Sequence, residues 1–248
     1  MFPDKRGKES ENPVYRNLIK PGDLFSFRVQ IKESDLFVLC DKRLIRETEE
    51  ALLKYRQDIE RYIYYNPLFK ESFKPLPPDE GMPDIVRCMA EVSQKVGVGP
   101  MAAVAGAIAE FVGKDLLSRC KQVIVENGGD IFMKVTKPRK VGIYAGTSPL
   151  SGKIALHITP EETPLGICCS AGTFGHSVSF GEADAAVVLS TSAILADAAA
   201  TAMGNLVKEE GDIKKGIRFL KSIPGVKGGL IIKNRRMGAW GKLNIIRG

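Results

Sequence analysis

Residues 122–135 read QVIVENGGDIFMKV, and this stretch decides the kind of fold to expect. Two short runs rich in Val, Ile and other apolar residues flank the turn-forming string Asn127-Gly128-Gly129-Asp130. Apolar runs of this length are typical of buried strands, and a short connection that contains glycine is typical of a hairpin. The stretch therefore predicts two antiparallel strands joined by a tight turn.

On the N-terminal side, the sequence predicts another hairpin and then three helices. Two β-rich runs between Leu24 and Cys40 are separated by Lys32-Glu33-Ser34. A helix with apolar residues at three- and four-residue steps starts at Leu44 and ends before Asn66-Pro67. The next helix starts with Asp84 as its cap and ends at Gly97, and an Ala/Gly-rich helix follows Gly99-Pro100 and runs to Arg119.

On the C-terminal side, strands again predominate. Strands grouped as hairpins, with helices between the groups, favour an α+β architecture with mainly antiparallel sheets over a regular βαβ alternation. The expected elements are strands over 141–146, 153–159, 166–170, 185–191, 230–233 and 243–247, helices over 194–210 and 213–223, and a turn over 234–241.

Length and composition suggest one large domain. The chain has 248 residues, of which 44% are hydrophobic, enough to bury a sizeable core. Prolines interrupt regular structure between Lys74 and Pro83, because each removes a backbone donor and fixes φ. We therefore expect a single domain over residues 1–248, with 74–83 as the candidate internal boundary.

The excess positive charge lies at the C-terminal end. The formal net charge is +7, and residues 208–248 contain 11 basic and 3 acidic residues, a local balance of +8. Such a segment could bind nucleic acid or another acidic partner. Its basic residues alternate with apolar ones at helix and strand spacing, however, which favours a solvated face. We therefore expect no nucleic-acid ligand.

Cysteine usage and hydropathy point to a reducing compartment. The five cysteines form an odd set without CxxC spacing, which favours reduced thiols over a disulfide framework or a zinc knuckle. The run from Val96 to Ala109 is too short and too rich in Gly and Ala to span a bilayer. The N-terminal residues lack the pattern of a secretory signal. A cytoplasmic location without membrane contact is the expectation.

Polar motifs interrupt the apolar core at three places between Val125 and Asn205. The turn Glu126–Asp130 could bring backbone N–H groups against a ligand or could be an ordinary hairpin turn. The loop Ser170–Ser177 carries glycines, hydroxyls and His176, which could form an anion cradle with an acid or base beside it, or could be structural.

The third motif lies on the expected Ala-rich helix. Steps of four residues place Asp197, Thr201 and Asn205 along one helix face. A carboxylate and a hydroxyl one turn apart suit a hard cation such as Mg²⁺, which prefers oxygen ligands. The alternative is structural: Asp197 would interact with the helix dipole, and the Thr201 hydroxyl would bond back to the helix.

Four strings taken in order resemble the ApbE superfamily of FAD:protein FMN transferases, and a group of shorter ApbE-like proteins within it. They are VGPMAAVAGAIAE (98–110), VENGGDI (125–131), SAGTFGHSVSFGEADA (170–185) and LADAAATA (195–202). The resemblance implies a T-fold-like α+β architecture, with FAD as ligand and Mg²⁺ as metal.

The resemblance also implies roles for particular residues. Metal ligands would be Asp197, Thr201 and a backbone carbonyl at Ala103. His176 or Asp197 would take the hydroxyl proton of an acceptor threonine as AMP leaves. The residues implied in ligand binding are Asn127, Gly128, Gly129, Asp130, Gly172 and Thr173.

The sequence departs from the transferases at two of these places. They carry a lysine where this chain has Gly106, and their histidine loop is only partly matched by residues 175–184. Three functions therefore stay open: a Mg²⁺-dependent flavin transferase acting on an acceptor protein, a non-catalytic module that binds flavin or nucleotide, and a partner-binding protein that uses the basic C-terminal segment. A homo-oligomer is compatible with each of them.

Overall fold

A large antiparallel sheet forms the centre of the molecule. The computed structural model describes residue 16 and residues 21–172 and 181–248. Eight strands follow one another in the order β1-β2-β3-β4-β7-β8-β9-β10, and every neighbouring pair is antiparallel. The strands are β1 (Phe25–Ile31), β2 (Ser34–Cys40), β3 (Val123–Asn127), β4 (Asp130–Lys134), β7 (Leu165–Ser170), β8 (Ala185–Ser190), β9 (Val226–Lys233) and β10 (Arg236–Gly241).

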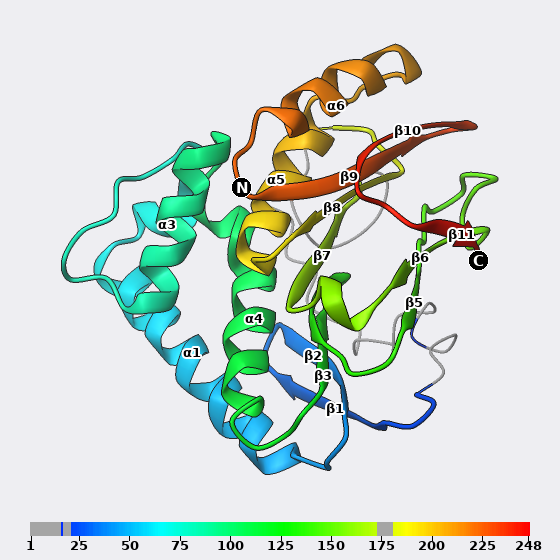
Figure 1. Ribbon diagram of the computed structural model, residues 1–248. Coiled ribbons are helices and arrows are strands. Elements are labelled where there is room, and N and C mark those ends of the chain that lie inside the picture. Colours follow the sequence, from blue (N-terminus) through cyan, green and yellow to red (C-terminus); the bar gives the residue numbers. More distant parts are fainter. Residues whose placement is uncertain (1–15, 17–20, 173–180) are drawn as a thin grey trace.

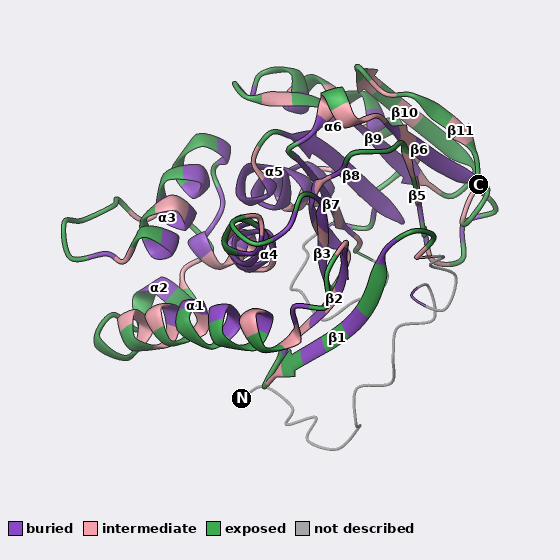
Figure 2. Ribbon diagram, turned by 60° about the horizontal axis from the view of Figure 1, so that its bottom comes forward, coloured by how far each residue is buried: buried purple, intermediate pink, exposed green. Residues whose placement is uncertain are grey.

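Helices cover one face of this sheet and a small sheet covers part of the other (Figures 1 and 2). The small sheet has the order β11-β6-β5, from β5 (Arg139–Gly142), β6 (Ile154–Ile158) and β11 (Ile245–Arg247). The helices are α1 (Ile45–Tyr65), α2 (Leu68–Glu71), α3 (Asp84–Val96), α4 (Val104–Leu116), α5 (Ala193–Asn205) and α6 (Ile213–Lys221), with the 3₁₀ turns η2 (Pro100–Ala103), η3 (Pro160–Glu162) and η4 (Glu210–Asp212). The α+β expectation with mainly antiparallel sheets is confirmed.

The buried hydrophobic residues form two clusters, one on each face of the large sheet. Strand β8 contributes side chains to both. Ala186 and Val188 belong to the hydrophobic cluster beneath the helices, whereas Val187 and Leu189 belong to the cluster beneath the small sheet. This alternation follows from the two-residue period of a strand. Both faces of the central strands are therefore buried, which explains their almost continuous apolar sequence.

Helices α1 and α3 form where the apolar spacing predicts them. Thr48, Leu52, Tyr55 and Ile59 lie on the buried face of α1. Gly97 ends α3 in the left-handed conformation, with φ of 79°. Asp84 was expected to cap α3, but it is the first helical residue, and its side chain makes no capping hydrogen bond. Pro83, which needs no backbone donor there, precedes it.

Several other boundaries differ from the sequence expectation; β9, for example, begins at Val226 and not at residue 230. Helix α5 ends at Asn205 and not at residue 210, because the chain turns at Leu206 toward the β7–β8 end of the sheet. Strand β5 covers Arg139–Gly142, earlier than the expected 141–146. The segment expected as the turn 234–241 contains β10, whose glycines and exposed side chains gave no strand signal.

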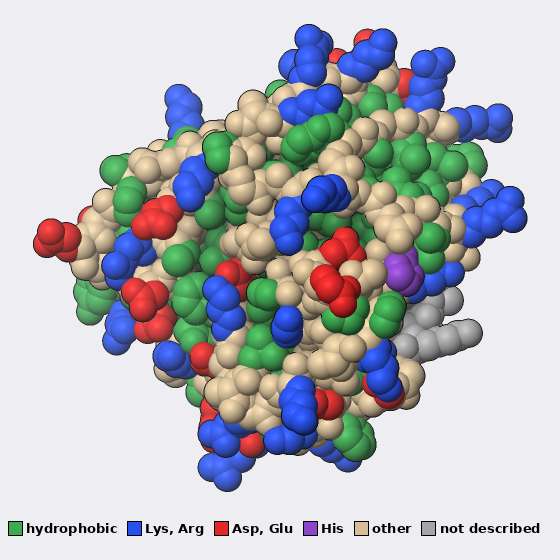
Figure 3. Space-filling model, viewed as in Figure 1, with side chains coloured by type: hydrophobic (Ala, Val, Ile, Leu, Met, Phe, Trp, Pro, Cys, Tyr) green, Lys and Arg blue, Asp and Glu red, His purple; other side chains and the backbone are tan. Residues whose placement is uncertain are grey.

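The basic residues of α6 lie on an exposed face, as the sequence pattern predicts. Lys214, Lys215, Arg218 and Lys221 are all exposed along α6, and basic side chains project over that edge in Figure 3. In the described ranges, no single helix is long and apolar enough to cross a membrane. Helix α3 and the segment Pro100–Leu116 reach that length and composition only as a pair bent by 105°.

Candidate functional site

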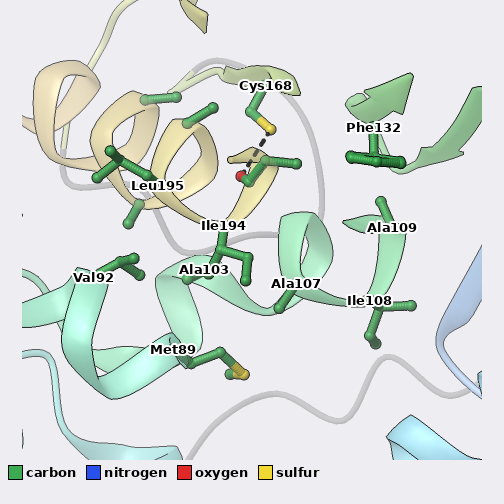
Figure 4. Close-up of a cluster of buried hydrophobic side chains, with 14 of the residues drawn as sticks. Met89, Val92, Ala103, Ala107, Ile108, Ala109, Phe132, Cys168, Ile194 and Leu195 are labelled. Carbon is green, nitrogen blue, oxygen red and sulfur yellow. Dashed lines mark hydrogen bonds between the residues drawn. The ribbon is translucent and has the colours of Figure 1, made fainter. Parts of the chain in front are cut away.

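The candidate site lies where α4 crosses α5, because small residues let three layers approach closely. A Cβ on Gly106 of α4 would lie 2.7 Å from the Asp197 Cβ and well inside contact with the Ala193 carbonyl oxygen. A Cβ on Gly166 of β7 would likewise collide with the backbone of Ala193. The start of α5 therefore lies between α4 and the sheet, and Figure 4 shows Ala103 of η2 and Ala107 of α4 facing Ile194 of α5.

Glu110 of α4 fixes the orientation of this crossing. Its Oε2 accepts hydrogen bonds from the Ser192 hydroxyl at 3.0 Å and from the Ile194 N–H at 3.2 Å, and its Oε1 pairs with Lys114 at 2.6 Å. The carboxylate thus accepts one of the backbone N–H groups that have no partner within their own helix at a helix start. Because Glu110 is buried, the interaction holds the first turn of α5 rigidly against α4.

Asp197 occupies the corresponding place at the start of α4. Its Oδ2 accepts the Gly106 N–H at 2.8 Å, so each helix supplies a carboxylate to the N-terminus of the other. Burial raises the pKa of Asp197 to about 7, although the N–H groups of Gly106 and Ala105 oppose the shift. The expected interaction with a helix dipole therefore exists, but it involves α4 and not the helix that carries Asp197.

Asp130 is a second buried carboxylate directed to the same place. It begins β4, and its Oδ1 accepts the Cys169 N–H at 3.2 Å. Burial, followed by the repulsion of Asp197, raises the pKa of Asp130 well above its usual range. Burial and the charges of Asp130 and Asp197 also raise the pKa of Cys168. In the described part of the chain, no lysine or arginine forms an ion pair with either carboxylate.

The turn between β3 and β4 is a two-residue hairpin. Gly128 and Gly129 have φ of 64° and 104°, values that favour glycine, and Asn127 pairs with Asp130 across the turn. The Gly129 N–H donates to Glu126 at 2.7 Å, so this donor is already engaged within the turn. The Asn127 amide donates to the Ala105 carbonyl at 3.2 Å, and this bond fastens the turn to the start of α4.

Thr201 and Asn205 continue the stripe of Asp197 along α5. Both are half-buried. The Thr201 hydroxyl makes no hydrogen bond to any residue that the structure describes, unlike Thr48 of α1, whose hydroxyl donates to the Leu44 carbonyl at 2.7 Å. Back-bonding of Thr201 within its helix is therefore not observed. Ala103 is fully buried at the junction of η2 and α4.

The glycine loop is described only at its two ends. Gly172 is exposed, its N–H donates to the Ala183 carbonyl at 2.9 Å, and a Cβ there would collide with the Gly181 carbonyl oxygen. The expected ligand residue Thr173 and the expected proton acceptor His176 lie outside the described residues.

The structure thus brings together residues from three of the sequence motifs. The Asn127 amide donates to the start of α4, and Asp197 accepts the Gly106 N–H. Asp197 is also close enough to raise the pKa of Asp130. Sequence reasoning missed the role of Glu110, although a lone acidic residue in the apolar string AVAGAIAEFV is a signal of a buried, bonded carboxylate.

Comparison with known proteins places the chain in a family. A family model described as "AbpE bacteria" matches residues 16–217. The chain therefore belongs to this family, within the ApbE-like superfamily.

Its relatives carry the name UPF0280 protein. One from Methanocaldococcus jannaschii is 40% identical over 225 residues, covering 88% of this chain and 91% of the relative. Another, from Methanospirillum hungatei, is 47% identical over 180 residues, covering 72% and 73%.

Solved structures agree in fold. The apo flavinyl transferase ApbE of Pseudomonas stutzeri gives a TM-score of 0.56 at 15% identity, covering 90% of this chain and 94% of that one. The ApbE protein of Thermotoga maritima gives 0.57 at 12% identity, covering 87% and 96%. At these identities the likeness shows a shared fold.

Proposed function

We propose that this chain binds Mg²⁺ together with a flavin dinucleotide, or a related phosphorylated ligand, where α4 crosses α5. The observation that carries the proposal is the pair of buried carboxylates Asp130 and Asp197. They repel one another, and no basic side chain of the described residues neutralises them. Buried acidic groups that lie together and have strongly shifted pKa values are typical of functional sites.

The donor set suits Mg²⁺. The Asp197 carboxylate, the unbonded Thr201 hydroxyl and the Ala103 carbonyl offer only oxygen atoms, which this small, hard cation prefers. When bound, the cation would offset the charge of a pyrophosphate group. Gly172 and Thr173, with the turn Asn127–Asp130, are the proposed ligand-binding residues around it.

Transfer of FMN to an acceptor protein is the second candidate. It is favoured by the flavinyl transferase of the same fold. In this reaction a threonine oxygen of the acceptor bonds to the FMN phosphorus, the pyrophosphate P–O bond breaks, and AMP leaves. The hydroxyl proton passes to Asp197 or His176.

Calorimetry with FAD, with and without Mg²⁺, tests the binding proposal. We expect FAD to bind in the presence of Mg²⁺, and we expect Asp197→Asn and Thr201→Val to weaken binding about tenfold or more. Asp212→Asn is the matched control, because Asp212 also accepts two backbone N–H groups but lies at the start of α6. Equal affinity in wild type and Asp197→Asn would refute the assignment.

Release of AMP separates the two candidates. Incubation with FAD, Mg²⁺ and a threonine-containing acceptor peptide yields AMP and a flavinylated peptide if the chain is a transferase. Binding of FAD without AMP, in protein whose fold is verified by circular dichroism, identifies a non-catalytic flavin or nucleotide-binding protein.

A further inference from the structure

We propose that Cys40, Asp41 and Cys120 form a binding site for a thiophilic divalent cation such as Zn²⁺, separate from the site at the α4–α5 crossing. One ligand atom from each of the three side chains lies within 4.8 Å of the other two. Among the described residues, this is the one group of Cys, His, Asp or Glu side chains that meets so closely. The inference goes beyond the proposed function and does not depend on it.

The backbone brings these residues together from distant parts of the sequence. Cys40 is the last residue of β2 and pairs with Val123 of β3, and Cys120 lies in the link between α4 and β3. Asp41 begins the link to α1. Its N–H donates to the Gln122 carbonyl at 3.4 Å, and its Oδ2 accepts the Lys121 N–H at 3.2 Å. The two links are therefore held side by side before any ion binds.

The donor geometry is close to that of a tetrahedral site. Zinc–sulfur bonds of about 2.3 Å place ligand atoms about 3.8 Å apart in a tetrahedron. The Cys40 Sγ and the Asp41 Oδ1 are already 3.8 Å apart. Since all three atoms fall within 4.8 Å, small side-chain rotations bring them to the bonding distance. Asp41 is only half-buried, so water can supply the fourth ligand.

A basic side chain lies beside the three proposed ligands. In the metal-free protein the Cys120 thiol donates to the Leu116 carbonyl at 3.1 Å. Lys42 follows Asp41 in the chain, and the Arg119 carbonyl, next to Cys120, holds its ammonium group at 2.5 Å. Binding of one cation releases one proton from each thiol, and the two thiolates and the carboxylate carry three negative charges against two positive ones. Lys42 offsets part of the remaining charge.

This position is remote from the candidate functional site. Cys40 pairs with the first residue of β3, whereas Asn127 is the last residue of the same strand. The two ends are about 13 Å apart along the strand, at about 3.3 Å per residue. The soft sulfur ligands also select a different class of metal from the oxygen ligands around Asp197.

The test titrates the full-length chain, reduced with a phosphine and freed of metal, with Co²⁺ and with Zn²⁺. We expect one equivalent of Co²⁺ to produce the near-ultraviolet absorption of a cobalt–thiolate bond, and Zn²⁺ to displace it. Cys40→Ser and Cys120→Ser should abolish the absorption, whereas Cys88→Ser, which removes a half-buried thiol from α3, should retain it. The absorption should also persist in Asp197→Ala, which separates this site from the Mg²⁺ site.

Two outcomes would overturn the proposal. One is the absence of the absorption when a thiol reagent shows that Cys40 and Cys120 are reduced and accessible. The other is Zn²⁺ uptake that is unchanged in the cysteine variants. If those variants do not fold, Asp41→Asn decides: we expect its Zn²⁺ affinity to fall about tenfold or more, and unchanged affinity refutes the site. Zn²⁺ should also raise the melting temperature of wild type, because it binds the native state.

Discussion

Buried acidic side chains lie on both sides of the β3–β4 hairpin turn. One group is neutralised by an arginine of the chain, and the other has no basic partner among the described residues. Glu126 is paired with Arg16 at 2.5 Å, and the same guanidinium binds Asp35 at 2.8 Å. The Arg16 side chain is completely buried. Asp130 and Asp197, by contrast, accept backbone N–H groups, and neither forms an ion pair with a basic side chain of the described residues.

The difference separates structural charge from functional charge. A buried carboxylate that serves the fold is neutralised by a cation from the chain, because an unpaired buried charge is costly. A carboxylate that binds a ligand has no such cation, so the free-energy cost of its buried charge is offset only when the ligand binds. Arg16 thus stabilises the turn, since Glu126 holds the Gly129 N–H, whereas the pair Asp130 and Asp197 remains available to a cation.

The largest expected effect is on the paired group. Arg16→Met should lower the free energy of unfolding by about 3–5 kcal/mol, because it leaves Glu126 buried without its cation. Urea unfolding followed by circular dichroism measures this. Arg46→Met is the control: it breaks an exposed pair with Glu50 on α1 and should change stability by less than about 0.5 kcal/mol. Equal effects of the two substitutions would contradict the structural role of Arg16.

A smaller loss is expected where α4 meets α5. Gly106→Ala places a methyl group against Ala193 and Asp197, and it should destabilise the protein by about 1–3 kcal/mol. Gly142→Ala is the matched control, because a Cβ there meets nothing within 4 Å. A Gly106→Ala variant as stable as Gly142→Ala would show that the crossing is looser than described.

The pH dependence should distinguish the unpaired carboxylates. The folded-state pKa of Asp197 is raised from 3.8 to about 7, so its contribution to stability is complete below pH 3.8 and is lost as the pH rises through 7. Metal-free wild type should therefore lose up to about 1.4 kcal/mol per pH unit as the pH rises from 3.8 to about 7, and Asp197 should cause no further loss above that range. Asp197→Asn should show a weaker dependence, with Asp130 responsible for the remainder. Urea unfolding in chelator at several pH values measures both, and parallel curves would refute the assignment.

The smallest expected effect concerns two threonines. Thr201→Val should change the free energy of unfolding by less than about 0.5 kcal/mol, because the hydroxyl is not hydrogen-bonded to any described residue. Thr48→Val removes a buried bond to the Leu44 carbonyl and should cost about 1 kcal/mol. Thermal unfolding compares them. A larger loss for Thr201→Val would indicate a structural hydroxyl.

Local patterns predicted most of the elements. The apolar steps of α1, the hairpin from Phe25 to Cys40 and the turn at Gly128 each depend on neighbouring residues alone. Strand β10 was missed because its pairing with β9, and not its own Gly-containing sequence, makes it a strand. The predicted end of α5, at residue 210, was wrong, because the polar residues after Asn205 are compatible with a helix. The helix ends at Asn205, where the chain turns back to the sheet.

The candidate site was predictable only in part. The step of four residues placed Asp197 and Thr201 on one face, and the family resemblance brought the NGGD turn to the same site. The N–H that Asp197 accepts belongs to a helix 91 residues earlier, and the repulsion between Asp130 and Asp197 depends on how β4 and α5 pack. Neither contact leaves a periodic signal, because each depends on tertiary packing.

The most direct test of the central claim is the effect of Mg²⁺ with FAD on the melting temperature of wild type and Asp197→Asn at slightly alkaline pH. If Asp130 and Asp197 bind a cation together with the ligand, Mg²⁺ with FAD raises the melting temperature of wild type, and this increase is lost in Asp197→Asn. The same increase in both proteins, or none in a folded wild type, would contradict the account.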